Sequence, residues 1–376
     1  MKPIHLFVPK YEISMCLEEI KDAMESGWTG LGGKTNDIEH DWKEYTGLNH
    51  AHFVNSATSG LHLAVRILKE KLGWRQGDEV ISTPITFVSS NHALLYEGLQ
   101  PRFADVDDFL CLDPKAVEAS ITPRTRAVMF VGHGGSTGQW RKIVDLCRAR
   151  GLSLILDAAH QAGTTLDGRC PGVDADAVVY SFHSVKNLPT ADSGMICFAD
   201  ESMDEAARRL SWLGIDRSTF LRTFSDGRYR WRYGVEEVGY KYHGNSIMAA
   251  IALAQLKVLE RDNDIRRAIS ARYDEAFARH PVIQPIPQPK GCRSSRHLYQ
   301  IRLQRRDDAI EYLNERQIYP GVHYLDNRQY GVYSGFDGPC PNAERASDEL
   351  LSLPLHLNLD ESDVERVIAA LLDFSA

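Results

Sequence analysis

The stretch from Ala177 to Asn187, AVVYSFHSVKN, decides the fold class. Its first half, Ala177 to Phe182, is an apolar run of the kind that forms a buried strand. Ser181, His183 and Lys186 come at the end of this run or shortly after it. The sequence therefore predicts a strand that delivers three polar side chains to one edge of a sheet.

A second apolar run lies about thirty residues upstream and ends in an acidic residue. Leu152 to Leu156 is followed by Asp157-Ala-Ala-His160. Because functional groups in α/β proteins gather outside the carboxyl ends of parallel strands, we expect Asp157 and Lys186 to lie near each other. A carboxylate and a lysine are the two groups that a pyridoxal phosphate (PLP) enzyme needs. The lysine forms a Schiff base with the cofactor aldehyde, and the carboxylate pairs with the protonated pyridine nitrogen.

The first 240 or so residues alternate strand-like runs with amphipathic stretches such as the expected helix Gly60 to Leu72. This alternation predicts an α/β fold with a mostly parallel sheet between helices. The expected strands are Ala51 to Val54, Glu79 to Ser82, Arg102 to Asp105, Ala127 to Val131, Leu152 to Leu156, Ala177 to Phe182 and Gly194 to Phe198.

From about Ser246 the pattern changes, and we expect a smaller C-terminal α/β domain. The predicted domains are residues 1–245, a large cofactor-binding domain with an N-terminal arm, and residues 246–376. The Pro-rich link that begins at Pro281 excludes a regular helix or a central strand. The other elements expected here are a long helix Ile247 to Asp262, an amphipathic stretch to about Arg279, a strand His297 to Leu303, and helices Asp307 to Arg316 and Glu361 to Leu372.

Composition excludes several classes of function. A formal net charge of −8 argues against nucleic-acid binding, and no apolar run is long enough to cross a bilayer. Seven scattered cysteines without a Cys-x-x-Cys spacing indicate reduced thiols, so we expect a cytoplasmic protein. The histidines at 50, 52, 133 and 183 have no partners at metal-ligand spacing, so we expect no metal.

Two further features fit a cofactor site but also allow structural explanations. The turn Asn55 to Gly60 follows a strand and precedes a helix, where backbone N–H groups favour a phosphate. Its Ser and Thr residues are also common helix N-caps, and for this turn taken alone the N-cap explanation is favoured. Phe87 follows another strand and could stack on a flat ring or fill the core. Only the order of these features along the chain favours the cofactor site.

Taken together, the motifs resemble those of the DegT/DnrJ/EryC1/StrS family of PLP-dependent nucleotide-sugar aminotransferases, which have the fold type I architecture. The resemblance covers nearly the whole chain. The segments that carry it are Ser56-Ala-Thr-Ser-Gly-Leu-His-Leu-Ala, Gly77-Asp-Glu-Val-Ile, Thr86-Phe-Val-Ser, Asp157-Ala-Ala-His, Ser181-Phe-His-Ser-Val-Lys-Asn, Gly239-Tyr-Lys-Tyr-His and Leu351-Ser-Leu-Pro-Leu.

The resemblance implies a role for each matching residue. Lys186 would be the Schiff-base lysine and Asp157 the partner of the pyridine nitrogen. Phe87 matches the aromatic residue that stacks on the cofactor ring, and His160 matches the residue at the 3-hydroxyl side.

It also implies a phosphate cradle and an oligomer. Ala57, Thr58 and Ser181 match the cradle, and His243 matches the residue that the second subunit contributes. The resemblance thus implies a homodimer with shared active sites.

The implied reaction moves an amino group from L-glutamate to the keto group of a nucleotide-linked keto-deoxysugar, in polysaccharide or amino-sugar biosynthesis. Thr29, Arg230, Lys241 and His323 are the candidate substrate contacts. Arg230 belongs to a basic, aromatic-rich stretch that is compatible with diphosphate binding or with a solvated hairpin. Its other arginines are Arg217, Arg222, Arg228 and Arg232.

Two alternatives to this function stay open at this point, and a third is disfavoured. The acceptor could be a cyclitol or another ketone. The chain could be a non-catalytic regulatory protein that retains the fold. A pyridoxamine-dependent sugar dehydratase is disfavoured, because those relatives carry His where this chain has Lys186.

Overall fold

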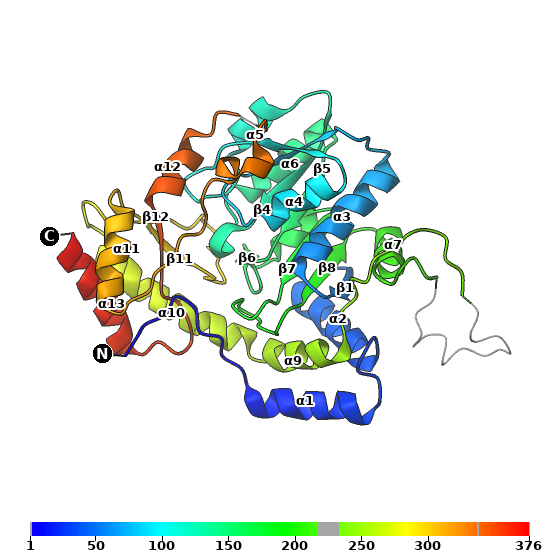
Figure 1. The fold of residues 1–376 in the computed structure, drawn as a ribbon, viewed down its shortest axis with the longest axis horizontal. Helices are drawn as coiled ribbons and strands as arrows, with labels where there is room; N and C mark the ends of the chain where they lie inside the picture. Colours follow the sequence, from blue (N-terminus) through cyan, green and yellow to red (C-terminus); the bar gives the residue numbers. More distant parts are fainter. Residues whose placement is uncertain (1, 217–232, 337, 376) are drawn as a thin grey trace.

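A seven-stranded sheet forms the centre of the molecule (Figure 1). The computed structural model describes residues 2–216, 233–336 and 338–375. In the sheet the strands follow the order β1-β8-β7-β5-β4-β2-β3. Their bounds are β1 (His50–Val54), β2 (Glu79–Ser82), β3 (Gln100–Phe103), β4 (Thr125–Val131), β5 (Ser153–Asp157), β7 (Ala177–Ser181) and β8 (Gly194–Phe198). All seven expected strands are present, with ends shifted by no more than two residues.

The direction of the strands places several strand ends at one edge. The pairs β2/β3, β2/β4, β4/β5 and β5/β7 are parallel, whereas β8 is antiparallel to both β7 and β1. Two reversals restore the direction, so β1 runs the same way as β7. The carboxyl ends of β1, β7, β5, β4 and β2 therefore share one edge of the sheet, where α/β proteins place their functional groups.

Helices cover both faces of this sheet. Alternate residues of β7 show why, because Val178 and Tyr180 lie in one hydrophobic core while Ala177 and Val179 lie in the other. The α-helices among the described residues up to Leu256 are α1 (Ile13–Glu25), α2 (Gly33–Thr46), α3 (Ala57–Leu72), α4 (Ser89–Tyr96), α5 (Pro114–Ser120), α6 (Trp140–Arg150), α7 (Glu201–Ser211) and α9 (Ser246–Leu256).

A smaller unit with its own core lies beside the sheet (Figure 1). The N-terminal arm belongs to it, since Ile4 is buried in that core and bridges to Ile318. Its strands pair in the order β12-β11-β9. The elements are α10 (Leu259–Phe277), β9 (Gln284–Pro285), β11 (Tyr299–Arg302), α11 (Arg306–Glu315), α12 (Pro341–Glu349), β12 (Leu350–Leu353) and α13 (Glu361–Phe374); a separate short pair joins β6 (Thr165–Leu166) to β10 (Cys292–Arg293).

The single long helix expected from Ile247 to Asp262 is wrong. The structure breaks it at Val258, whose φ of −116° and ψ of 0° are not helical. Buried alanines of α9 pack among the residues of the main core, whereas α10 carries Tyr273 and Phe277 into the smaller core. Before the break, α9 packs against α1 and α2, while after it α10 continues into the smaller unit and contacts α13 (Figure 1). The division into domains 1–245 and 246–376 stays a prediction.

Candidate active site

Asp157 occupies the carboxyl end of β5 and is buried. Its Oδ2 accepts a hydrogen bond from the Ser90 hydroxyl at 2.7 Å, and its Oδ1 accepts one from the Ala159 N–H at 3.0 Å. Burial raises the pKa of Asp157, and these two hydrogen bonds and the charge of Lys186 oppose that effect. A cation beside this carboxylate is therefore favoured.

Lys186 follows β7 and reaches the same edge. A turn in which the Lys186 N–H donates to the His183 carbonyl at 2.8 Å directs the side chain. Burial lowers the pKa of the Lys186 amine to about 8, and the negative charge of Asp157 acts in the opposite direction. The predicted acid and lysine are thus close enough to interact electrostatically. The lysine has a substantial neutral fraction near neutral pH, as a nucleophile requires.

Four histidines and a tyrosine line the same region. Among them, the rings of His160 and His297 lie 4.3 Å apart, and His133 lies 6.1 Å from His160. The Tyr324 hydroxyl lies 3.3 Å from the Nε2 atom of His160. The fourth histidine is His323, whose Nδ1 lies 3.0 Å from the Ser352 hydroxyl. We call His133, His160, His297 and His323 the histidine cluster.

Burial keeps the histidine cluster neutral. It lowers the pKa of His133 to about 4 and that of His323 to about 3. It also holds the pKa of His160 and His297 well below the usual value, and in all four the charge of Lys186 adds to the effect. Each ring is therefore available as a neutral donor and acceptor.

This burial predicts a pH-dependent stability. The pKa of His133 is lower in the folded state than the ordinary value of about 6.5, so the unfolded chain binds a proton that the folded chain refuses. The free energy of unfolding should fall below pH 6.5, by about 2 kcal/mol for His133 alone at pH 5. Urea unfolding at pH 7.5, 6.5 and 5 measures this loss.

The matched variants are His133→Gln and His183→Asn. Gln retains a donor towards Gln300, the partner of His133, but does not titrate, so the acid loss should shrink. His183 is exposed and serves as the control, whose replacement should leave the pH dependence as in the wild type. Equal pH dependence in His133→Gln and the wild type would contradict the assignment.

The turn before α3 has a helix N-cap and also backbone N–H groups, unpaired among the described residues, that could face a phosphate. The Ser56 hydroxyl accepts a hydrogen bond from the Ser59 N–H at 3.2 Å, so the N-cap exists. The N–H groups of Ala57 and Thr58 make no hydrogen bond to any described residue. Gly194 lies against this turn, and a Cβ there would come within 2.9 Å of the Ala57 nitrogen. Unpaired N–H groups at a helix N-terminus are donors of the kind that favour an anion.

Ser181 ends β7 at the same edge of the sheet as this turn. Its partner in β8 is Gly194, which also pairs with Val54 at the end of β1. The register therefore places Ser181 two strands away from the N-terminus of α3. Within the described residues, the Ser181 hydroxyl accepts one long hydrogen bond, from the His183 N–H at 3.4 Å.

Phe87 is not core filler. Its side chain is 59% exposed, which is unusual for phenylalanine, and its ring lies 6.1 Å from that of Tyr324. The exposed ring at the strand-end edge is available to stack on a planar ligand.

His243 and Lys241 lie on a segment that runs along the end of β1, and we call residues 240–244 the β1 clamp. The Tyr242 carbonyl accepts a hydrogen bond from the Asn55 N–H at 2.8 Å, and the Gly244 N–H donates to the Phe53 carbonyl at 2.9 Å. The Lys241 amine lies 3.4 Å from the centre of the Trp212 ring. The buried Nε2 atom of His243 has no hydrogen-bond partner among the described residues.

The other candidate substrate contacts, His323, Thr29 and Arg230, lie in different parts of the chain. His323 lies in the histidine cluster, while Thr29 is exposed and its carbonyl accepts a hydrogen bond from the Ser246 N–H at 3.1 Å. Arg230 lies outside the described residues, as do Arg217, Arg222, Arg228 and Arg232.

Sequence reasoning gave no role to several side chains in this region, among them Tyr324. Asn187 and His297 contact each other, and Phe7 stacks on His297 with ring centres 5.6 Å apart. Phe7 comes from the N-terminal arm, about 180 residues before Lys186, so no spacing could have indicated it. In the described part of the chain no three or more His, Cys, Asp or Glu residues gather as a metal site. Nor is any helix there long and apolar enough to cross a membrane.

A buried acid and a lysine lie at neighbouring strand ends of a mostly parallel sheet, which is the pair of groups that PLP-dependent α/β enzymes use. The chain belongs to the DegT/DnrJ/EryC1/StrS aminotransferase family, whose model matches residues 11–372.

Known relatives cover almost the whole chain. The spore coat polysaccharide biosynthesis protein SpsC of Bacillus subtilis is 36% identical over 370 residues, which is 95% of this chain and 93% of the relative. The dTDP-4-dehydro-2,3,6-trideoxy-D-glucose 4-aminotransferase of Saccharopolyspora spinosa is 34% identical, over 93% and 91%. The structure of Spr1654 from Streptococcus pneumoniae in its PMP form is 28% identical, with a TM-score of 0.91 and 98% of each chain covered.

Proposed function

We propose that this aminotransferase uses PLP to move an amino group from L-glutamate to the keto group of a nucleotide-linked keto-deoxysugar. The juxtaposition of the Lys186 amine with the buried Asp157 carboxylate carries the proposal. Two relatives act in related chemistry by their names, one in polysaccharide biosynthesis and one on a dTDP-linked keto sugar. Spr1654 is known in both PLP and PMP forms.

The residues present fit this cofactor. The free N–H groups of Ala57 and Thr58 would hold its phosphate together with Ser181. The exposed Phe87 ring would stack on the pyridine, and Asp157 would pair with its nitrogen. His160 would contact the 3-hydroxyl side. When bound, the cofactor supplies an electron-withdrawing ring that makes an amino acid's α-proton removable.

The chain's own groups have separate tasks. Lys186, with its pKa lowered to about 8, can attack a carbonyl, and once released it can remove a proton and return it as general base and acid. Asp157 offers a buried carboxylate to a cation. His160 accepts a hydrogen bond at Nδ1 from the Gly134 N–H, so its Nε2 carries the proton and faces Tyr324.

We propose that the sugar nucleotide contacts Thr29, Arg230, Lys241 and His323. Diphosphate groups need cationic or N–H donors, and the chain has both Lys241 and the arginine-rich stretch around Arg230 in this part of the sequence. A cytoplasmic location agrees with the seven free cysteines, which form no disulfide.

The test is an absorbance spectrum of purified protein with PLP, before and after L-glutamate. The expected result is a visible band from the lysine-bound cofactor that bleaches to the near-ultraviolet band of pyridoxamine phosphate. Keto sugars linked to dTDP or to UDP are then added one at a time. The sugar that is the amino acceptor should restore the visible band. A protein that gives no visible band with PLP would refute the proposal. If only a cyclitol ketone restores the bleached band, the acceptor is a cyclitol and not a nucleotide-linked sugar.

We further propose a homodimer in which the partner subunit's His243 completes the phosphate site. Mixing subunits tests this. Lys186→Ala and His243→Ala protomers should be weakly active or inactive alone at limiting PLP. When they are co-expressed, half of the dimers are mixed, and each mixed dimer has one intact site, so about a quarter of the wild-type activity should return. Activity no higher than the sum of the two parents would place His243 in its own subunit's site.

A further inference from the structure

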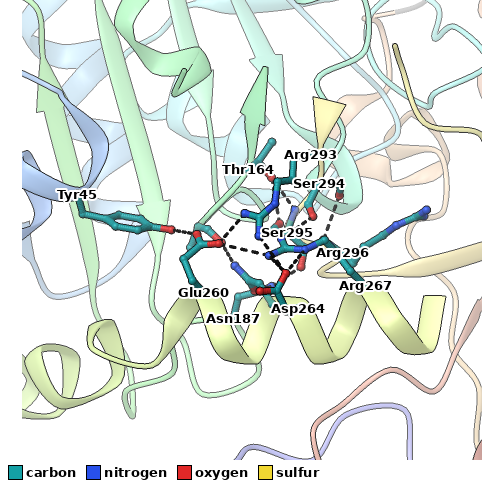
Figure 2. Close-up of polar contacts among 12 residues, drawn as sticks. Tyr45, Thr164, Asn187, Glu260, Asp264, Arg267, Arg293, Ser294, Ser295 and Arg296 are labelled. Carbon is teal, nitrogen blue, oxygen red and sulfur yellow. Dashed lines mark hydrogen bonds and ion pairs between the residues drawn. The ribbon is translucent and has the colours of Figure 1, made fainter. Parts of the chain in front are cut away.

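The side chain of Asn187, next to Lys186 in sequence, has only one possible orientation. Its Nδ2 atom lies 2.7 Å from the Ser295 carbonyl oxygen and 2.6 Å from the Asn263 Oδ1 atom. Because a carbonyl oxygen only accepts hydrogen bonds, the amide NH₂ of Asn187 must face Ser295. The Oδ1 atom of Asn187 is therefore left to face His297 (Figure 2 shows Asn187 and Ser295 in this network).

This orientation fixes the tautomer of His297. The Asn187 Oδ1 atom lies 3.0 Å from the His297 Nδ1 atom and can only accept, so Nδ1 carries the ring proton. Since burial keeps the ring neutral, its Nε2 atom has a free lone pair. That lone pair faces the Lys186 amine, with Nε2 and Nζ 3.5 Å apart.

We propose that His297 is a positioning residue for Lys186. The unprotonated Nε2 atom accepts a hydrogen bond from the lysine amine and so orients the amine's own lone pair, and Asn187 keeps His297 in the tautomer that can do this. The functional consequence rests on the proposed role of Lys186, whereas the tautomer itself does not.

The surrounding contacts hold the His297 ring still. Phe7 stacks on it with an interplanar angle of 8°, and the His160 ring lies at 4.3 Å. The Ser295 hydroxyl donates to the His160 carbonyl at 2.7 Å, and the Ser295 N–H donates to Thr164 at 3.0 Å (Figure 2). Two distant parts of the chain therefore meet in one rigid network beside the lysine.

Other titratable groups also act on the amine, but from farther away. Asp157 raises its pKa, and the charge of Lys186 in turn acts on His133, His160 and His323. Among the described residues, His297 alone provides a side-chain atom within hydrogen-bond distance of the Lys186 amine. It is therefore the group best placed to orient the amine.

The test uses cofactor-free protein and two readouts. Nitrogen NMR of ¹⁵N-histidine-labelled protein should show His297 protonated at Nδ1 and not at Nε2. Acetic anhydride labelling of Lys186 across pH, quantified by mass spectrometry, should give an apparent pKa of about 8.

The decisive variant is Asn187→Leu. Loss of the acceptor should give His297 a mixture of tautomers, and the apparent pKa of Lys186 should fall by about one unit because its ammonium form loses a hydrogen bond. Ser294→Ala is the matched control, since its hydroxyl bonds only the Arg296 N–H in the same segment. It should change neither readout.

His297→Phe provides a second test if Asn187→Leu is poorly folded by circular dichroism. Its ring keeps the stacking on Phe7 but has no nitrogen, and the same fall in the Lys186 pKa is expected. A wild-type His297 protonated at Nε2 would overturn the proposal, as would an unchanged lysine profile in both variants. Because neither readout needs PLP, a protein that passes both tests yet fails to bind PLP would refute only the proposed function.

Discussion

Replacing Lys186 with alanine should reduce the transamination rate by at least about 10²–10⁴-fold, the contribution of a single positioned proton-transfer group. The loss follows from the site, because the histidines beside Lys186 are imidazoles that burial keeps neutral and cannot replace its primary amine. Steady-state turnover with L-glutamate and the identified keto sugar measures the effect. The visible absorbance of the lysine-bound cofactor should disappear as well.

The control for this variant is Lys241→Ala. Lys241 is exposed and lies on the Trp212 ring, so its loss should affect sugar binding at most and leave the visible band in place. Substantial turnover in Lys186→Ala would show that Lys186 is not the catalytic lysine, whatever the activity of Lys241→Ala.

Replacing Asp157 with asparagine is expected to lower turnover by about 10²–10³-fold. The carboxylate is buried, and removing one partner of a buried charge pair costs about 2–5 kcal/mol, or about tenfold per 1.4 kcal/mol. The amide preserves the shape but does not hold the pyridine nitrogen in its protonated form. Turnover and the position of the cofactor absorbance band measure the change.

Stability separates this effect from misfolding. Burial raises the pKa of Asp157, which means that its charge costs folding free energy above the ordinary pKa of about 4. The cofactor-free Asp157→Asn protein should therefore be at least as stable as the wild type at pH 7. Ser90→Ala removes the 2.7 Å hydrogen bond to Asp157, together with the contacts of the same hydroxyl to Thr86 and to the Phe87 carbonyl, and should have a smaller effect on turnover. Wild-type turnover in Asp157→Asn would contradict the assignment.

The fold was largely predictable because each central strand is marked by a continuous apolar run. The runs that end at Asp157 and Ser181 are buried on both faces, and such runs are visible without any knowledge of pairing. The break at Val258 was not predictable in this way. No Pro or Gly marks it, and it lies where the chain passes from the main core, which holds α9 and Leu259, towards the smaller core, which holds Tyr273 and Phe277.

The candidate site was predictable only where it lies on strand ends. Asp157 and Lys186 follow apolar runs, so their meeting could be inferred from topology. His297, Tyr324 and Phe7 lie in irregular segments far apart in the sequence, and only tertiary packing brings them together. The histidine cluster therefore has no local signature.

The β1 clamp is hydrogen-bonded to the chain immediately before the turn at the N-terminus of α3. Residues 240–244 make backbone hydrogen bonds with Phe53 and Asn55, immediately before the N-terminus of α3. If His243 serves the partner subunit's site as proposed, one short segment braces its own subunit's anion site and completes the other one. Cofactor and second subunit then behave as coupled ligands, so the factor by which PLP tightens the dimer equals the factor by which dimerisation tightens PLP. Dilution of the enzyme should accordingly release subunits and cofactor together.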